Sequence, residues 1–120
     1  MAEKRMFSKS VVASSDFMNL KTSARELYFQ LGLQADDDGF LNNAEYIRRM
    51  VGAKKSDYIA LVENGYLINI RPGLDVIRHW NVNNTLRSDR YKSTIYQSEK
   101  DTLRIVGGRY ERVEDEVCNA

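Results

Sequence analysis

Apolar residues recur at helical spacing between residues 20 and 35 of the chain. Ser23 and Glu26 stand at the spacing of a capping box, in which both side chains bond free backbone N–H groups at a helix start. The segment therefore predicts a helix with one apolar face, ended by the turn-forming residues 36–39. A short helical turn is expected upstream, at residues 15–18. The predicted inward residues are Ala24, Leu27, Tyr28, Leu31 and Ala35.

Two shorter amphipathic segments follow, after residues 40–41, which allow a strand of only two or three residues. A second capping box at residues 42–45 predicts a helix that ends at Gly52, and a third helix begins near Ser56 and ends at residues 64–65. The tight connection between them is typical of a helix-turn-helix. The predicted inward residues are Ile47, Met50 and Val51 on the second helix and Tyr58, Leu61 and Val62 on the third, with Arg48 and Arg49 outward.

Apolar residues alternate in segments 66–70 and 74–79, which flank Arg71, Pro72 and Gly73. This pattern predicts a β-hairpin, and a hairpin directly after the third helix would make a winged helix. The predicted fold is therefore mainly α with a small β component, a winged helix-turn-helix with a C-terminal helical and hairpin extension. We expect the winged-helix domain to span residues 1–85.

Residues 86–120 form the predicted C-terminal extension, which is basic at first and then of mixed charge. A helix is expected at residues 95–103. A hairpin of segments 103–106 and 109–113 is expected around the two-residue turn Gly107-Gly108. Because the extension has few apolar residues, we expect it to be only partly ordered without a partner or a longer chain.

Composition changes this picture only when the charges are located. The 120 residues carry 18 Lys and Arg against 17 Asp and Glu, a formal net charge of +1. This balance excludes a histone-like polycation, but the acids cluster at residues 36–38 and 111–116 while residues 78–92 are almost purely basic. The lone cysteine, Cys118, excludes an internal disulfide and favours a reducing compartment. No membrane span or signal peptide is expected.

The basic stretch at residues 78–92 is the strongest candidate for contact with DNA. Guanidinium and ammonium groups neutralise phosphates, and Asn amides bond phosphates or base edges. We expect Trp80 to belong to the core, and the alternative for the whole stretch is a solvated loop. The candidate contacts are Arg78, Asn84, Arg87, Arg90, Tyr91 and Lys92, with Arg71 at the wing tip placed to enter a minor groove.

The third helix occupies the position of a recognition helix, yet its expected exposed residues Asp57, Ala60 and Glu63 suit it poorly, because carboxylates repel phosphate. The residues at its N-terminal end are better candidates, aided by the helix dipole. A plain solvated face is the alternative. The candidates here are Lys54, Lys55 and Ser56, with Arg48 and Arg49 of the second helix as further phosphate contacts.

Other chemistry is weakly supported by the sequence. Asp36, Asp37 and Asp38 suggest a metal site, but adjacent carboxylates cannot all point at one cation, so a helix-ending turn is favoured. One histidine, His79, and no nucleophile motif or Gly-rich phosphate loop argue against an enzyme. We therefore expect no catalytic residues, no bound metal and no cofactor.

Several blocks of the chain together resemble the replisome-organiser or replication-initiator proteins of phages of Gram-positive hosts. The N-terminal domain of that family is a winged helix similar to the DnaD primosome family. The most specific block is the one around residues 89–92. The blocks that carry the resemblance are residues 4–9, 35–43, 47–53, 77–80, 84, 87–92 and 94–100.

The resemblance implies non-catalytic binding of duplex or single-stranded DNA at a phage or prophage replication origin, in the cytoplasm of a bacterial host. It further implies self-association and, where a second domain exists, recruitment of a host helicase loader. Two alternatives remain: a winged-helix module for protein contacts or oligomerisation, and a prophage transcriptional regulator. The near-zero net charge predicts modest, salt-sensitive affinity for one chain, so strong binding would need several homo-oligomeric copies.

Overall fold

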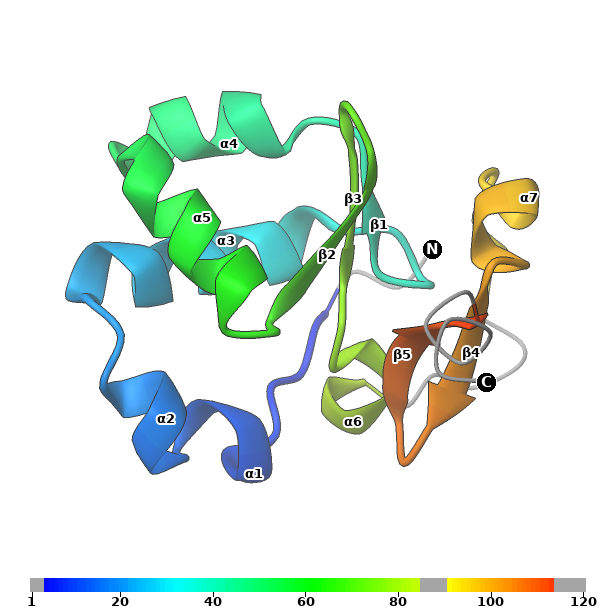
Figure 1. Cartoon of the computed structure of the whole chain (residues 1–120), viewed down its shortest axis with the longest axis horizontal. Helices are drawn as coiled ribbons and strands as arrows, with labels where there is room; N and C mark the ends of the chain where they lie inside the picture. The colour runs from blue at the N-terminus through cyan, green and yellow to red at the C-terminus, as the bar shows by residue number, and fades with distance from the viewer. Residues whose placement is uncertain (1–3, 85–90, 114–120) are drawn as a thin grey trace.

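Helices and short strands make a mixed α/β fold in the computed structural model, which describes residues 4–84 and 91–113 (Figure 1). No helix in these ranges is long and apolar enough to cross a membrane. The elements are α1 (Lys9–Val12), α2 (Ser15–Met18), α3 (Thr22–Gln34), β1 (Phe40–Leu41), α4 (Ala44–Val51), α5 (Lys55–Glu63), β2 (Leu67–Arg71), β3 (Leu74–Ile77), α6 (Trp80–Asn83), α7 (Gln97–Lys100), β4 (Leu103–Val106) and β5 (Arg109–Arg112).

The helices begin without the capping boxes that the sequence predicts. Helix α3 starts after Lys21, and its first turn has no side-chain cap, so the box at Ser23 and Glu26 is wrong. Helix α4 starts after Asn43, again without a side-chain cap. Glu45 then lies one position too early to reach back to its N-terminus. The two predictions fail because a one- or two-residue shift of the start changes which carboxylate can cap.

Two antiparallel sheets carry the strands. The first has the order β1-β3-β2, with Phe40 opposite Val76 and Leu67 opposite Ile77. The second is the predicted hairpin β4-β5, which turns at Gly107-Gly108 and places Arg104 opposite Glu111. The helix expected at residues 95–103 is only α7, four residues long, because Leu103 already starts a strand.

Aromatic residues from the helices and the first sheet form the centre of the core. The ring of Phe17 contacts those of Tyr28 and Tyr66 edge to face, with centroids 5.2 and 5.4 Å apart. The predicted inward face of α3 is buried throughout. Met50 is an error of the prediction, since 70% of it is exposed. Met50 follows buried Ile47 by three residues, at the edge of the buried face of α4, and its side chain extends into solvent.

The described part of the C-terminal extension packs into the same core as the rest of the chain. Leu103 and Tyr110 belong to the buried cluster, and the Tyr110 hydroxyl donates to the carbonyl of Asp38 at 2.7 Å. The backbone N–H of Tyr110 donates to the carbonyl of Arg78. The expected boundary between domain and extension, near residue 85, falls outside the described residues.

The acidic run 36–39 is the predicted turn after α3. Asp36 accepts the backbone N–H groups of Asp38 and Phe40, and Gly39 takes a φ of +90° beside the ring of Trp80. Trp80 is buried, as expected, and donates from its indole to the carbonyl of Asp37. Among the described residues, no group of His, Cys, Asp and Glu could hold a metal ion.

Candidate nucleic-acid interface

The N-terminal end of α5 presents exposed cations. Lys54, Lys55 and Ser56 are all exposed, and no ion pair is formed by either lysine within the described residues. The sequence predicts Asp57 on this surface, which is wrong: it is 2% exposed, and its carboxylate accepts the backbone N–H of Lys54 at 2.8 Å. Since this acid caps the helix from inside, the exposed end of α5 is more cationic than its sequence suggests.

The two arginines of α4 are engaged with Glu45. Arg48 donates to it at 2.6 and 3.0 Å and also bonds the carbonyl of Ala53, whereas Arg49 pairs with it at 3.3 Å and keeps an exposed side chain. The hydrogen bonds from Arg48 lower the pKa of Glu45 to about 2. Arg48 therefore joins α4 to the turn before α5, and Arg49 is the arginine of the pair that faces solvent.

Arg71 lies at the end of β2, beside the hairpin turn. Half of its side chain is exposed, and its Nε pairs with Glu99 of α7 at 3.2 Å. An exposed pair of this kind contributes little to stability and is easily exchanged for another anion. Arg71 is thus available at the tip of the hairpin, close to one competing carboxylate.

The structure divides the described residues of the basic stretch 78–92 between two places, since Asn84 and Tyr91 line one pocket and Arg78 lines another. The amide oxygen of Asn84 accepts the backbone N–H of Met6, and the hydroxyl of Tyr91 donates to the carboxylate of Asp38. The backbone N–H of Lys92 donates to Asp37, with the side chain exposed. Arg87 and Arg90 lie outside the described residues. Asn84 and Tyr91 thus hold the N-terminal segment and residues 91–100 to the fold, while Arg78 lies elsewhere.

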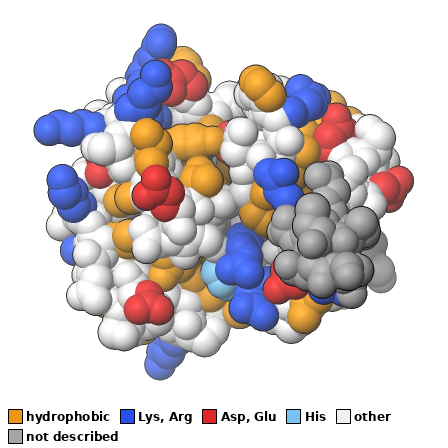
Figure 2. All heavy atoms as spheres, viewed as in Figure 1, with side chains coloured by type: hydrophobic (Ala, Val, Ile, Leu, Met, Phe, Trp, Pro, Cys, Tyr) orange, Lys and Arg blue, Asp and Glu red, His pale blue; other side chains and the backbone are white. Residues whose placement is uncertain are grey.

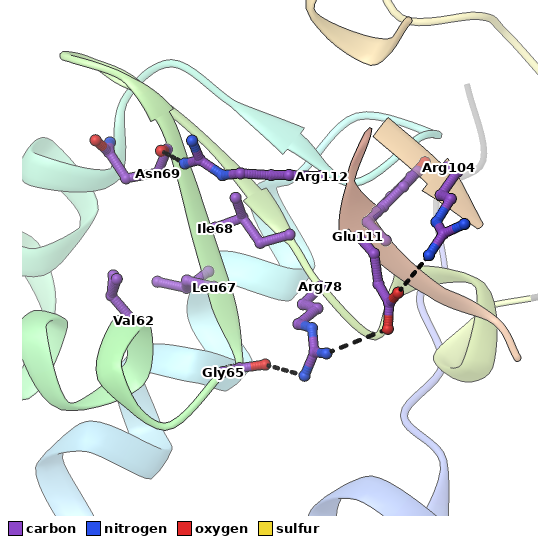
Figure 3. A pocket seen from close by; sticks show the side chains of 10 residues that line it. Val62, Gly65, Leu67, Ile68, Asn69, Arg78, Arg104, Glu111 and Arg112 are labelled. Atoms are coloured by element: carbon purple, nitrogen blue, oxygen red, sulfur yellow. Dashed lines mark hydrogen bonds and ion pairs between the residues drawn. The ribbon is translucent and has the colours of Figure 1, made fainter. Parts of the chain in front are cut away.

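A groove of about 580 Å³ separates β2 from β5, and arginines line it (Figure 3). Arg78 and Arg104 point from opposite sides toward Glu111, whose oxygens lie 3.7 and 3.6 Å from their guanidinium nitrogens. Arg112 reaches across to donate to the carbonyl of Asn69. Three arginines and one carboxylate therefore line this groove, in the described part of the chain.

The pKa of His79, which follows Arg78 in the chain, is sensitive to the charges beside this groove. Burial, together with the positive charges of Arg78 and Arg109, lowers the pKa of its imidazole to about 4. Arg109 also pairs with Glu111, at 3.7 Å. Burial and the two neighbouring guanidinium groups thus both disfavour the charged imidazolium.

Cations gather at two places on one face of the molecule. Figure 2 shows Lys and Arg side chains around the passage from α4 to α5, and a second group beside the histidine, where Figure 1 places the space between β2 and β5. The first group and Arg78 are predicted from the sequence, but Arg104 and Arg112 are not. Their pairing could have been predicted from the two-residue turn at Gly107-Gly108, because this turn fixes a register in which position 104 is opposite 111 and position 103 is opposite 112.

Fold and site together define a mixed α/β domain with a cationic face. Comparisons with known proteins do not assign this domain to a family. No protein-family model matches the chain, and no solved structure matches it. A curated protein, the tRNA modification GTPase MnmE of Bacillus cytotoxicus, is 27% identical over 104 residues. The match covers 85% of this chain but only 22% of that protein, so the chain spans about a fifth of the relative it matches.

Proposed function

We propose that the chain is a winged-helix DNA-binding domain of a phage or prophage replication initiator, which binds duplex DNA at a replication origin without catalysis. The element order supports the fold: α3, β1, α4 and α5 precede the hairpin β2-β3, and β1 pairs with β3. Only residues 52–54 connect α4 to α5, the length expected of a helix-turn-helix. The family resemblance supports the replication role.

The observation that carries the DNA-binding proposal is the exposed, cationic start of α5. Lys54 and Lys55 add two charges to the positive end of the helix dipole, while Asp57 is turned inward. The start of α5 and the tip of the β2-β3 hairpin, where Arg71 lies, both occupy the upper part of Figure 1. In this proposal the duplex lies across both, with phosphates on the lysines and Arg71 in a groove.

Fluorescence anisotropy with a labelled duplex, over a series of salt concentrations, tests the assignment. The double substitution Lys54→Ala/Lys55→Ala is expected to weaken binding at least tenfold at low salt. It should reduce the slope of log K against log salt by about 2, since each lost phosphate contact removes about 0.9. The matched control is Lys9→Ala/Lys21→Ala, which removes two exposed lysines of α1 and of the residue before α3. This control should change binding far less.

Equal losses in both double variants, or no duplex binding by the unaltered chain at low salt, would refute the proposal. Absence of DNA binding together with a discrete oligomer in light scattering favours the protein-interaction module instead. Tight binding to a palindromic operator favours a transcriptional regulator, whereas an origin binder prefers direct repeats. Because the curated relative is named as a GTPase, a GTP hydrolysis assay is a further test. Hydrolysis by the purified chain would contradict a non-catalytic role.

A further inference from the structure

The outer face of α5 carries an apolar residue at its most outward position. Ile59 is 48% exposed, whereas Asp57 and Leu61, two residues before and after it, are buried. Two residues of an α-helix turn the chain by about 200°. Ile59 therefore lies on the side of the helix opposite to both buried residues, and its side chain extends into solvent from the middle of the exposed face.

Polar residues lie on the same face, one helical turn before Ile59. Lys55 and Ser56 precede it by four and three residues, so both are its neighbours on the exposed surface. Lys54, at the N-cap, is exposed as well. Glu63 is exposed one turn beyond Ile59, as the last residue of the helix. The N-terminal half of the outer face thus combines two cations, a hydroxyl group and one large apolar side chain.

This combination of side chains is suited to the major groove of duplex DNA. The cations complement the phosphates beside the groove, and a hydroxyl group can bond the edge of a base. The apolar group that a base pair presents in the major groove is the C5 methyl of thymine. A protein partner is a poorer fit, because protein interfaces bury about 800 Å² on each side around an apolar centre, far more than one isoleucine provides.

We infer that Ile59 recognises thymine in the major groove, by contact between its side chain and the C5 methyl of the base. The inference rests on the proposed function, which places the duplex across the start of α5. Lys54 and Lys55 supply affinity that does not depend on the base sequence, and Ile59 adds a preference for thymine. Because the carboxylate of Glu63 repels phosphates, the N-terminal half of the helix is the half that faces the bases.

Replacing thymine by uracil in the probe tests this contact, because uracil lacks the C5 methyl and leaves the phosphates and the base pairing in place. The probes are labelled duplexes of alternating dA-dT and of alternating dA-dU, equal in length, measured by fluorescence anisotropy at low salt. The unaltered chain should bind the thymine duplex about fourfold more tightly, which is the effect of burying one methyl group. Ile59→Ala should bind the two duplexes equally. Its affinity for the uracil duplex should stay within about twofold of the unaltered chain, which shows that the variant folds and keeps its phosphate contacts.

Ile105→Ala, the same change at an exposed position of β4, is the matched control and should keep the preference for thymine. Equal binding of both duplexes by the unaltered chain overturns the inference and leaves the proposed function in place. A preference that persists in Ile59→Ala also overturns it, because the preference then comes from the shape of the thymine duplex. If the unaltered chain binds neither duplex, the proposed function fails and the inference fails with it.

Discussion

At the scale of the residue, burial decides what a charged side chain contributes. Asp57 looks like a surface acid of the third helix in the sequence, yet it is a buried cap. Asp37 and Asp38 belong to a run for which the sequence favours a turn over a metal site, and in the structure Asp37 pairs with Arg5 while Asp38 accepts bonds from Tyr91 and Thr94. Each acid lies where backbone N–H groups or cations replace the water that it loses.

Gly39 is the residue at which the acidic turn depends most on backbone freedom. Its φ is +90°, and a Cβ would lie 2.7 Å from the Trp80 ring. Gly39→Ala should therefore lower the free energy of unfolding by about 2–4 kcal/mol, from the strain of positive φ together with overpacking. Gly73, with a φ of +83° and nothing near its Cβ position, is the control: Gly73→Ala should cost about 1 kcal/mol. Urea unfolding of both variants measures the difference, and equal losses would show that the Trp80 contact is unimportant.

At the scale of the element, the C-terminal hairpin is held to the rest of the fold by a few contacts. The side chains of β4 after Leu103 are exposed, whereas those of β5 are half-buried or buried. Tyr110 and Leu103 are buried, and Arg112 bonds the edge of β2. The hairpin therefore forms one wall of the groove, and its position decides whether Arg78, Arg104 and Arg112 meet there.

Tyr110→Ala tests whether this hairpin unfolds together with the core. The substitution removes a ring that is 1% exposed and its bond to Asp38, so the free energy of unfolding should fall by about 3–5 kcal/mol. One shared transition, followed by far- and near-ultraviolet circular dichroism, is expected in both proteins. A separate early transition in the unaltered chain would instead show that the hairpin is an independent unit. Ile105→Ala, at an exposed position of β4, is the control and should cost less than 1 kcal/mol.

At the scale of the whole molecule, the net charge of +1 does not show that acids and cations are placed differently in the fold. Acids of residues 36–38 lie inside or half-inside, bound to the N-terminal segment and to residues 91–100. Cations at α5 and in the groove remain at the surface. The face that we assign to DNA is therefore more positive than the composition suggests, and its affinity should depend steeply on salt.

Arg5 connects the N-terminal segment to two distant parts of the chain. It pairs with Asp37 at 3.0 Å, donates to the carbonyl of Ala35 and lies over the ring of Trp80. Arg5→Ala leaves the buried carboxylate without this cation, so the free energy of unfolding should fall by about 3–5 kcal/mol. Lys4→Ala changes an exposed neighbour of the same charge and should stay within about 0.5 kcal/mol of the parent. Urea unfolding compares them, and similar losses in both would contradict a structural role of Arg5.

The sequence by itself determined the elements whose cause is local. The apolar periodicity of α3 and α5, the Pro72-Gly73 turn and the Gly107-Gly108 turn predict structure because spacing and backbone freedom act within a few residues. The burial of Trp80 followed from its size and setting. The cations at the start of α5 could be identified in the same way, since a helix start is a local feature.

Only the tertiary structure decided which charged residues, far apart in the sequence, lie next to one another. Arg78, Arg104 and Glu111 come from three strands or their ends, and β5 brings them together by binding the backbone after β3. In the same way, Asn84 and Tyr91 lie against the N-terminal segment and the acidic turn. Pairing between distant segments depends on which surfaces can be buried together, and that is a property of the whole fold rather than of any stretch of sequence.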